Sequence, residues 1–195
     1  MAKIKLTKNE LKTQRDALKR FSRYLPTLQL KKQQLQMEMR RLDLEIEEKR
    51  DEEQEARAKL SSWIQLYSEP IELGPYAEVE TLKTSHGNIA GVNIPVLDDL
   101  VFKRVIPDLF ETEAWTDEGI AVLKQLTRLR VERQILEEQH RLLGEELRTT
   151  TQRVNLFEKV KIPEAKENIR VIRIFMGDQQ TAAVARSKIA KGKSA

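Results

Sequence analysis

The sequence has no cysteine among its 195 residues and only two histidines. Disulfides and thiolate metal sites are therefore excluded, and two isolated imidazoles offer no basis for a metal site. No apolar run approaches the roughly 20 residues of a membrane-spanning helix, and the N-terminus lacks the apolar block of a signal peptide. We therefore expect a soluble, intracellular protein.

Aromatic residues are scarce at 5%, whereas charged residues make up 34% of the chain. Such a composition is too polar for a compact core of this length, but it suits long helices.

The net charge of +4 hides an uneven distribution of charge along the chain. Residues 1–32 carry ten Lys and Arg against two acids, and residues 186–195 are basic without any acid. Residues 68–118 show the reverse, with eleven Asp and Glu against three basic residues. If the chain folds back on itself, both termini lie at a basic end and the middle lies at an acidic end.

Apolar residues follow a heptad pattern from about Ile4 to Trp63. When Ile4 is placed at position a, most a and d positions are apolar, and Lys, Arg, Glu and Gln dominate between them. A stripe this narrow, held for about nine heptads, is typical of a coiled-coil seam. The helix would be about 90 Å long and would need a partner.

A second heptad series follows Thr116, whose hydroxyl and following acids predict a helix start. Its phase slips by one residue near Pro163, and such an insertion locally unwinds a supercoil. Pro26 interrupts the first series, where we expect a kink rather than a stop. Beyond Gly177 the sequence is small and basic, and it is expected to be frayed or helical. The predicted coil core consists of Leu18, Phe21, Leu25, Leu28, Leu35, Met39, Leu42, Ile46, Leu126, Leu129, Leu136, Leu143, Leu147, Val154 and Phe157.

A β-hairpin is predicted at about residues 79–95, where two alternating stretches flank a turn-forming centre at residues 85–88. Gly87, Asn88 and Gly91 are its expected structural residues, and His86 is expected to be an ordinary turn residue. Because a lone two-stranded hairpin is marginal in water, it should pack on the end of the coil or on another protein.

The predicted fold class is dominated by α-helix, with the N- and C-terminal arms forming a long antiparallel two-helix coiled coil and the small central β-hairpin region at its loop end. Its expected segments are a coiled-coil helix, an acidic connector with the hairpin, a second coiled-coil helix and a basic tail: residues 1–66, 67–115, 116–177 and 178–195.

An antiparallel register in which facing residue numbers sum to about 180 accounts for the polar core positions. It predicts three sets of facing charges: Lys32 with Glu145 and Glu146, Lys49 with Glu132, and Glu53 with Arg128 and Arg130. We interpret these charges as fixing the register at some cost in stability. His140, at an a position, is expected to be a packed core imidazole rather than a ligand.

No catalytic constellation is present, so a non-enzymatic protein without catalytic, cofactor-binding or metal-binding residues is expected. The segment Gly192-Lys193-Ser194 looks like the end of a phosphate-binding loop, but Ser187 stands where that motif needs glycine. The basic N-terminal segment gives nucleic-acid binding some electrostatic support, but it lacks aromatic interleaving and a recognised module.

Three segments resemble the D subunit of V-type and archaeal-type rotary ATPases. The sequence Arg-Val-Asn-Leu-Phe-Glu-Lys-Val-Lys-Ile-Pro at residues 153–163, leading into residues 169–173, is similar to that family's C-terminal signature. Residues 88–95 are similar to its central hairpin segment, and residues 6–11 fit its N-terminal run. Residues 24–27 depart from the family pattern.

The resemblance implies a non-catalytic central-stalk rotor without cofactors. Its basic terminal end would enter the ring of alternating catalytic and nucleotide-binding subunits, A and B. The small rotor component known as the F subunit would bind the flank of the coil, and the hairpin end would face the cap subunit of the membrane ring. Rotation would link ATP hydrolysis or synthesis to proton or sodium transport.

The resemblance also implies a cytoplasmic protein peripheral to the membrane, with no nucleic-acid partner and no membrane insertion of its own. Two alternatives remain open from the residues alone: a free-standing coiled-coil scaffold or tether, and a basic nucleic-acid-binding helical protein.

Overall fold

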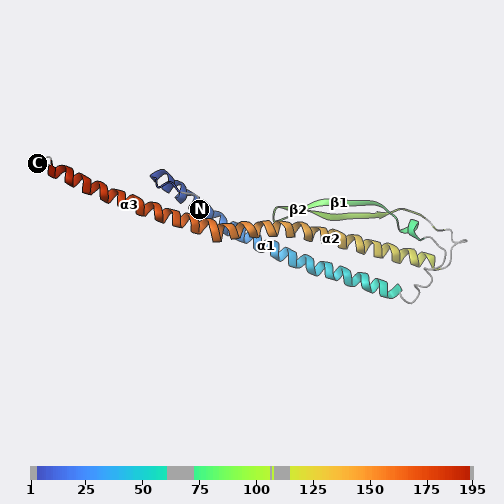
Figure 1. Ribbon diagram of the computed structural model, residues 1–195. Coiled ribbons are helices and arrows are strands. Elements are labelled where there is room, and N and C mark those ends of the chain that lie inside the picture. Colours follow the sequence, from blue (N-terminus) through green and yellow to red (C-terminus); the bar gives the residue numbers. More distant parts are fainter. Residues whose placement is uncertain (1–3, 61–72, 106, 108–114, 194–195) are drawn as a thin grey trace. The chain divides into compact units, whose positions relative to one another are not determined.

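The computed structural model describes residues 4–60, 73–105, 107 and 115–193. Its elements are mostly helical, with one two-stranded antiparallel sheet (Figure 1). In chain order they are α1 (Lys8–Leu60), η2 (Gly74–Ala77), β1 (Val79–Ile89), β2 (Val92–Phe102), α2 (Thr116–Leu156), the π-helix η3 (Phe157–Lys161) and α3 (Ile162–Lys193). This confirms the predicted fold class. Trp63, at the end of the first heptad series, lies outside the described residues.

The chain divides into two compact units, to which α1 contributes in turn. The terminal unit comprises residues 1–33 and 148–195, and the central unit comprises residues 34–147.

In the terminal unit, the first half of α1 packs against α3. The buried side chains are Leu11, Ile169 and Ile172, with Leu18 and Met176 partly buried beside them. The residue numbers of Leu11 and Ile169, which pack together, sum to 180. The two helices of this unit therefore run antiparallel in the predicted register.

Thr7 caps the start of α1. The backbone N–H of Glu10 donates to its Oγ1 at 3.2 Å, so one otherwise unpaired donor of the first helical turn is satisfied. Glu10 follows Thr7 by three residues, so this segment has the sequence of a capping box. The assignment of Thr7 to a heptad position obscured this signal.

Pro26 lies inside α1 without ending it, as predicted. The missing N–H of the proline leaves the Ser22 carbonyl without its usual helical donor. The Thr27 hydroxyl donates a hydrogen bond to the Tyr24 carbonyl at 2.8 Å, and this bond stabilises the helical turn around the proline.

The π-helix η3 explains the slip of the heptad phase near Pro163. A π turn contains one residue more than an α turn, so the residues after it move on by one position while the apolar stripe stays on the same face. The N–H of Ile162 donates to the Phe157 carbonyl five residues earlier. The widened turn also precedes a proline, whose ring would crowd the carbonyls of a regular helix.

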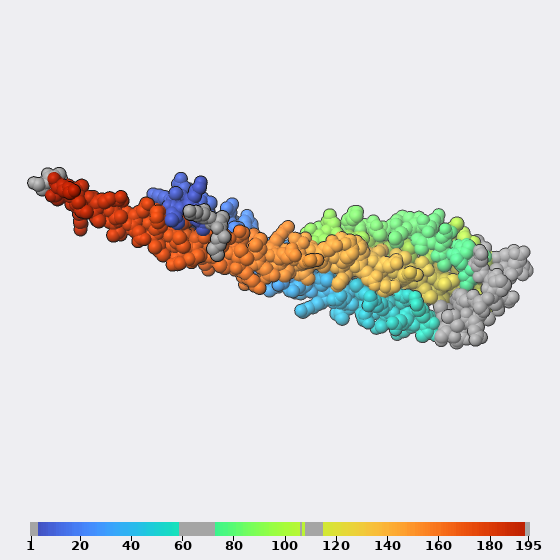
Figure 2. All heavy atoms as spheres, in the orientation of Figure 1, coloured from blue at the N-terminus to red at the C-terminus, as the bar shows by residue number. Residues whose placement is uncertain are grey.

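Helix α3 continues through Gly177 to Lys193. Residues 178–193, for which the sequence left open a helical or a frayed state, are therefore helical. Every residue from Gly177 to Lys193 is exposed, and on the face shown in Figure 2 no other described segment covers this end of α3.

In the central unit, the second half of α1 packs against α2, and the hairpin lies along the helices (Figure 1). The core contains Leu35 and Leu42 from α1, Leu143 from α2 and Ile94 from β2. The hairpin therefore packs against the side of the helix pair, and the prediction that it packs on the end of the coil is wrong. Sharing this core is how a two-stranded sheet becomes stable.

The hairpin turn is at Ala90 and Gly91, so the predicted turn at residues 85–88 is wrong. Their φ angles are 51° and 80°, and both are positive, as a tight two-residue hairpin turn requires. The side chain of Asn88 accepts from the N–H of Gly91 at 3.1 Å and donates to Asn93 at 3.0 Å. The polar residues that suggested a turn therefore brace its flanks.

Gly87 and His86 lie within β1, where His86 faces Pro95 across the strands. His86 is thus a strand residue and not a turn residue. A Cβ atom at Gly87 would lie 2.9 Å from Cγ2 of Val96, so glycine is required here by the close approach of β2 and not by a turn.

Helix α2 begins at Thr116, but its start differs from the prediction. The Thr116 side chain is buried, and its hydroxyl has no hydrogen-bond partner among the described residues. The first turn is closed instead by the N–H of Gly119, which donates to the Trp115 carbonyl at 2.9 Å. Asp117 and Glu118 supply the expected acidic first turn.

Candidate functional site

The predicted ion pair between Lys49 and Glu132 is present in the central unit. The Lys49 Nζ lies 3.2 Å from Glu132 on α2 and 2.9 Å from Glu52 on its own helix. The hydrogen bond to Glu52 has the largest effect and raises the pKa of Lys49 above 10.5. Burial opposes this rise, and the hydrogen bond to Glu132 and the charges of both carboxylates add to it. The pair ties α1 to α2 at the position that the predicted register gave for these two residues.

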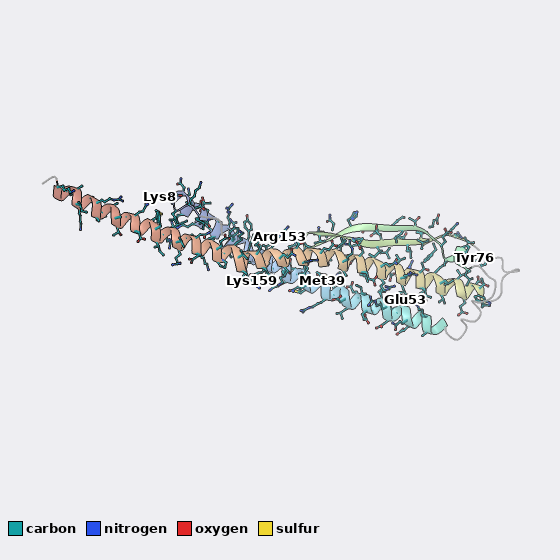
Figure 3. All side chains as sticks on the ribbon, in the orientation of Figure 1. Lys8, Met39, Glu53, Tyr76, Arg153 and Lys159 are labelled. Atoms are coloured by element: carbon teal, nitrogen blue, oxygen red, sulfur yellow. The ribbon has the colours of Figure 1, made fainter. Side chains whose placement is uncertain are left out.

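Glu53 pairs with Arg133 and not with Arg128 or Arg130, so those two predicted partners are wrong. Arg133 Nε lies 3.2 Å from Glu53 Oε2, while Arg57 binds Oε1 of the same carboxylate at 2.6 Å. Arg133 occupies an a position of the second heptad series, and therefore it points at the seam where Glu53 also lies. Glu53 is labelled on α1 in Figure 3.

The charge network extends beyond Glu53. Arg133 Nη1 lies 2.8 Å from Glu137, which Arg50 of α1 also approaches at 3.4 Å. Hydrogen bonding to Glu137 and the charges of Glu137 and Glu53 raise the pKa of Arg133 above its ordinary value. Glu53 and Arg133 are largely buried, so these charges are satisfied within the helix pair and hold its register.

His140 lies at the edge of the core, so the prediction of a packed core imidazole is wrong. Its Nε2 is 3.0 Å from Asp43 Oδ1 of α1, and 35% of its side chain is exposed. Lys32 and its predicted partners Glu145 and Glu146 belong to different units, so their pairing stays a prediction.

A polar layer lies within the helix pair of the terminal unit. Asn168 Nδ2 donates to Gln14 Oε1 at 3.3 Å, and Gln14 Nε2 donates to Glu10 at 2.8 Å. Asn168 is 9% exposed. A buried amide pair is satisfied in one alignment only, so this layer favours a single register at a cost in stability. Just beyond it, the rings of Phe21 and Phe157 approach to 5.1 Å between centroids.

None of the fifteen predicted coil residues is exposed. Six are buried: Leu35, Leu42, Ile46, Leu129, Leu143 and Val154. Nine are partly buried: Leu18, Phe21, Leu25, Leu28, Met39, Leu126, Leu136, Leu147 and Phe157. Both Pro26 and Pro163 are exposed.

Two important contacts were not found from the sequence, and both fasten the hairpin to the helices. Ile94 enters the core of the central unit. The buried side chain of Gln139 on α2 donates to the Pro95 carbonyl at 2.6 Å. The alternation along β2 identifies an inward face, but it does not say which surface that face meets.

Basic side chains surround a cavity of about 440 Å³ in the terminal unit. It is lined by Arg15, Leu18 and Lys19 from α1 and by Lys166, Ile169 and Arg173 from α3. Positive charge therefore gathers on both helices here.

The described residues contain no group of three or more His, Asp or Glu side chains placed to hold a metal ion. Among the helices of the described ranges, none combines the length and the apolar character needed to cross a bilayer.

Comparison with known proteins reveals full-length relatives. The sequence model of the family described as the D subunit of ATP synthase matches residues 10–192. The D subunit of the V-type ATP synthase of Borreliella burgdorferi is 51% identical over 191 residues, covering 98% of this chain and 95% of that relative. The D subunit of the V-type ATP synthase of Chlamydia caviae is 34% identical over 195 residues, covering 98% and 94% of the two chains.

Proposed function

Because this chain belongs to the family of ATP synthase D subunits, we propose that it is the non-catalytic central rotor shaft of a V-type ATPase. In this role it transmits rotation between ATP hydrolysis or synthesis in the catalytic ring and ion translocation in the membrane sector.

The antiparallel helix pairing supports the proposal most directly. A shaft must resist sliding and untwisting between its two strands. Leucine packing resists separation, while the Lys49–Glu132 and Glu53–Arg133 pairs and the Gln14–Asn168 layer each oppose slippage. Within each unit these contacts join segments far apart in sequence, so torque on one helix is passed to the other.

The proposed partners come from the resemblance to D subunits of V-type ATPases. The basic terminal unit enters the bore of the ring formed by the A and B subunits. The F subunit binds the flank of the coil, and the hairpin region faces the cap subunit of the membrane ring. We further propose that the irregularities at Pro26 and Pro163 bend the shaft, so that each catalytic site meets a different face of it.

A rotation assay tests the proposed role. The chain has no cysteine, so Glu80→Cys on exposed β1 gives one attachment point for a bead once the shaft is assembled with an immobilised ring. We expect ATP-dependent rotation in one direction, and none without ATP. A chain that fails to bind the ring, or a bead that stays still in an ATP-hydrolysing complex, would contradict the proposal.

Purification from native membranes separates the rival functions. A rotor component co-purifies with an ATPase, whereas a free scaffold does not. A nucleic-acid-binding protein would be retained on DNA and would elute with a steep dependence on salt concentration.

A further inference from the structure

The basic cavity of the terminal unit gathers four cations around two apolar side chains. None of its four cations (Arg15, Lys19, Lys166 and Arg173) makes a hydrogen bond or ion pair with another described residue. All four are exposed.

Several arginines elsewhere on the helices form ion pairs within the chain. Arg141, for example, holds Glu138 and Glu145 at 2.6 Å each, and Arg133 holds Glu53 and Glu137. The four cations around the cavity take no part in these ion pairs.

Two carboxylates of α3 near the cavity are already engaged by other cations. Glu167, next to Lys166, accepts two hydrogen bonds from Arg170 at 2.6 and 2.9 Å, and these bonds lower the pKa of Glu167. Glu164 lies 3.2 Å from Lys161. The cavity cations form no ion pair with Glu164 or Glu167, so a negative group from outside the chain can pair with them.

The apolar side chains that line the cavity indicate which class of ligand fits it. The floor of the cavity is formed by Leu18 and Ile169, which belong to or border the apolar core of this unit. A phosphate group would pair with the cations at the rim of the cavity but leave these apolar side chains uncovered. A peptide segment that carries both carboxylates and an apolar side chain satisfies the rim and the floor together.

We propose that this cavity is a docking site for an acidic segment with an apolar side chain, supplied by a subunit of the catalytic ring. The inference rests on the proposed function, because the ring is the partner that surrounds the terminal unit. Carboxylates of the segment pair with the four cations, and its apolar side chain covers Leu18 and Ile169. The shaft is then gripped at a defined face rather than by diffuse attraction.

Carbodiimide cross-linking of the assembled complex tests the docking directly, because this reagent joins a lysine amine to a carboxylate in direct contact. In the wild-type shaft bound to the ring without ATP, we expect amide links from Lys19 or Lys166 to Asp or Glu of a ring subunit. Lys8 and Lys12 are exposed lysines of α1 outside the cavity and serve as internal controls. Ring cross-links that come equally from Lys8 and Lys12, or none from the cavity lysines, would overturn the proposal.

A pair of charge-matched variants tests the energetics. The cavity variant carries Arg15→Gln, Lys19→Gln, Lys166→Gln and Arg173→Gln. The control carries Lys8→Gln, Lys12→Gln, Arg20→Gln and Arg23→Gln, which removes two lysines and two arginines from exposed sites outside the cavity. Helix content and thermal unfolding verify that both variants fold.

For binding of the full-length shaft to the shaft-free ring, we expect the cavity variant to lose at least about tenfold in affinity and the control less than about threefold. The cavity variant should also show a flatter dependence of affinity on salt. Equal losses would mean diffuse electrostatics and would overturn the site. A wild-type shaft that does not bind the ring would instead refute the proposed function, so the two failures are distinguishable.

Titration of the free shaft with inorganic pyrophosphate examines the competing ligand class. We expect no binding that distinguishes the cavity variant from the control. Pyrophosphate binding that is lost only in the cavity variant would assign the cavity to a phosphate ligand and overturn the peptide proposal.

Discussion

Single residues of the helix pairs act through charges that are satisfied in one register. Lys49 and Glu53 interrupt the apolar seam of the central unit, and each finds a partner on the opposite helix at 3.2 Å. Removing one member would take the counter-ion on the opposite helix away from a partly buried charge, which costs more than the pair itself contributes. The charges therefore select the alignment of the helices more than they add to stability.

The pH dependence of unfolding should reveal the role of Lys49. Its pKa in the folded state is raised above 10.5, so its stabilising charge is complete below the unfolded value and is lost as the pH rises through the folded value. We expect wild-type stability to fall more steeply above pH 10.5 than that of Lys49→Arg, because guanidinium remains protonated there. Urea unfolding across this range measures the difference. Parallel decline of both proteins would show that Lys49 does not contribute through its charge.

Two glycines should respond to the same substitution with opposite sign. Gly91 has a φ of 80°, so Gly91→Ala should destabilise the hairpin by about 1–2 kcal/mol. Gly177 lies inside α3, and an added Cβ would meet no atom within 4 Å, so Gly177→Ala should stabilise the local helix by about 0.5–1 kcal/mol. Amide hydrogen exchange at the two sites reports both changes. Slower exchange around Gly91→Ala would contradict the turn geometry.

At the scale of elements, the helices tolerate irregularities where a regular coil would be simpler. Pro26 removes a hydrogen bond from α1, and η3 widens the opposite helix by one residue beside Pro163. Both irregularities belong to the terminal unit. Such features cost stability, and their presence on both helices of this unit is consistent with a role in function.

Replacing Pro26 should separate stability from function. Pro26→Ala restores the helical hydrogen bond to Ser22 and should raise the free energy of unfolding by up to about 3 kcal/mol. If the irregularities bend the shaft as proposed, combining it with Pro163→Ala should lower the ions transported per ATP hydrolysed. The matched control is Thr27→Ala, which removes only the side-chain hydrogen bond to Tyr24. Unchanged coupling in the double variant, together with a straight coil, would remove the bending hypothesis.

The hairpin is an integral part of the central unit. Ile94 is 4% exposed among Leu35, Leu42 and Leu143, so Ile94→Ala should destabilise this unit by about 2–4 kcal/mol. Leu82→Ala on β1 is the control, because Leu82 is 48% exposed and should cost less than about 0.5 kcal/mol. Denaturant unfolding compares the two variants. Equal effects would mean that the hairpin does not share the helical core.

At the scale of the whole molecule, both helix pairs form within one chain. The contacts between α1 and α2 and between α1 and α3 are intramolecular, so the unfolding midpoint should not change over a hundredfold range of protein concentration. Circular dichroism at increasing dilution measures this. A midpoint that falls on dilution would show that the arms pair between separate molecules.

Much of the fold could be predicted because the heptad pattern is a property of the chain itself. The narrow stripe demands a partner helix. The sum of facing numbers near 180 fits Leu11 with Ile169 and Lys49 with Glu132, whereas the numbers of Glu53 and Arg133 sum to 186. The one-residue phase slip likewise coincides with η3, since only an inserted residue keeps Ile169 and Ile172 on the buried face.

The sequence by itself determined the two long helices, their antiparallel alignment and the basic character of the terminal segments. Periodicity and charge can be read from residues that are close together in the sequence. Only the tertiary structure decided that Glu53 meets Arg133, that Ile94 enters the helical core, and that four cations around Leu18 and Ile169 are left without partners among the described residues. Each of these depends on which side chains, distant in sequence, converge in space. A local pattern shows the face on which a side chain lies, whereas packing determines what that face meets.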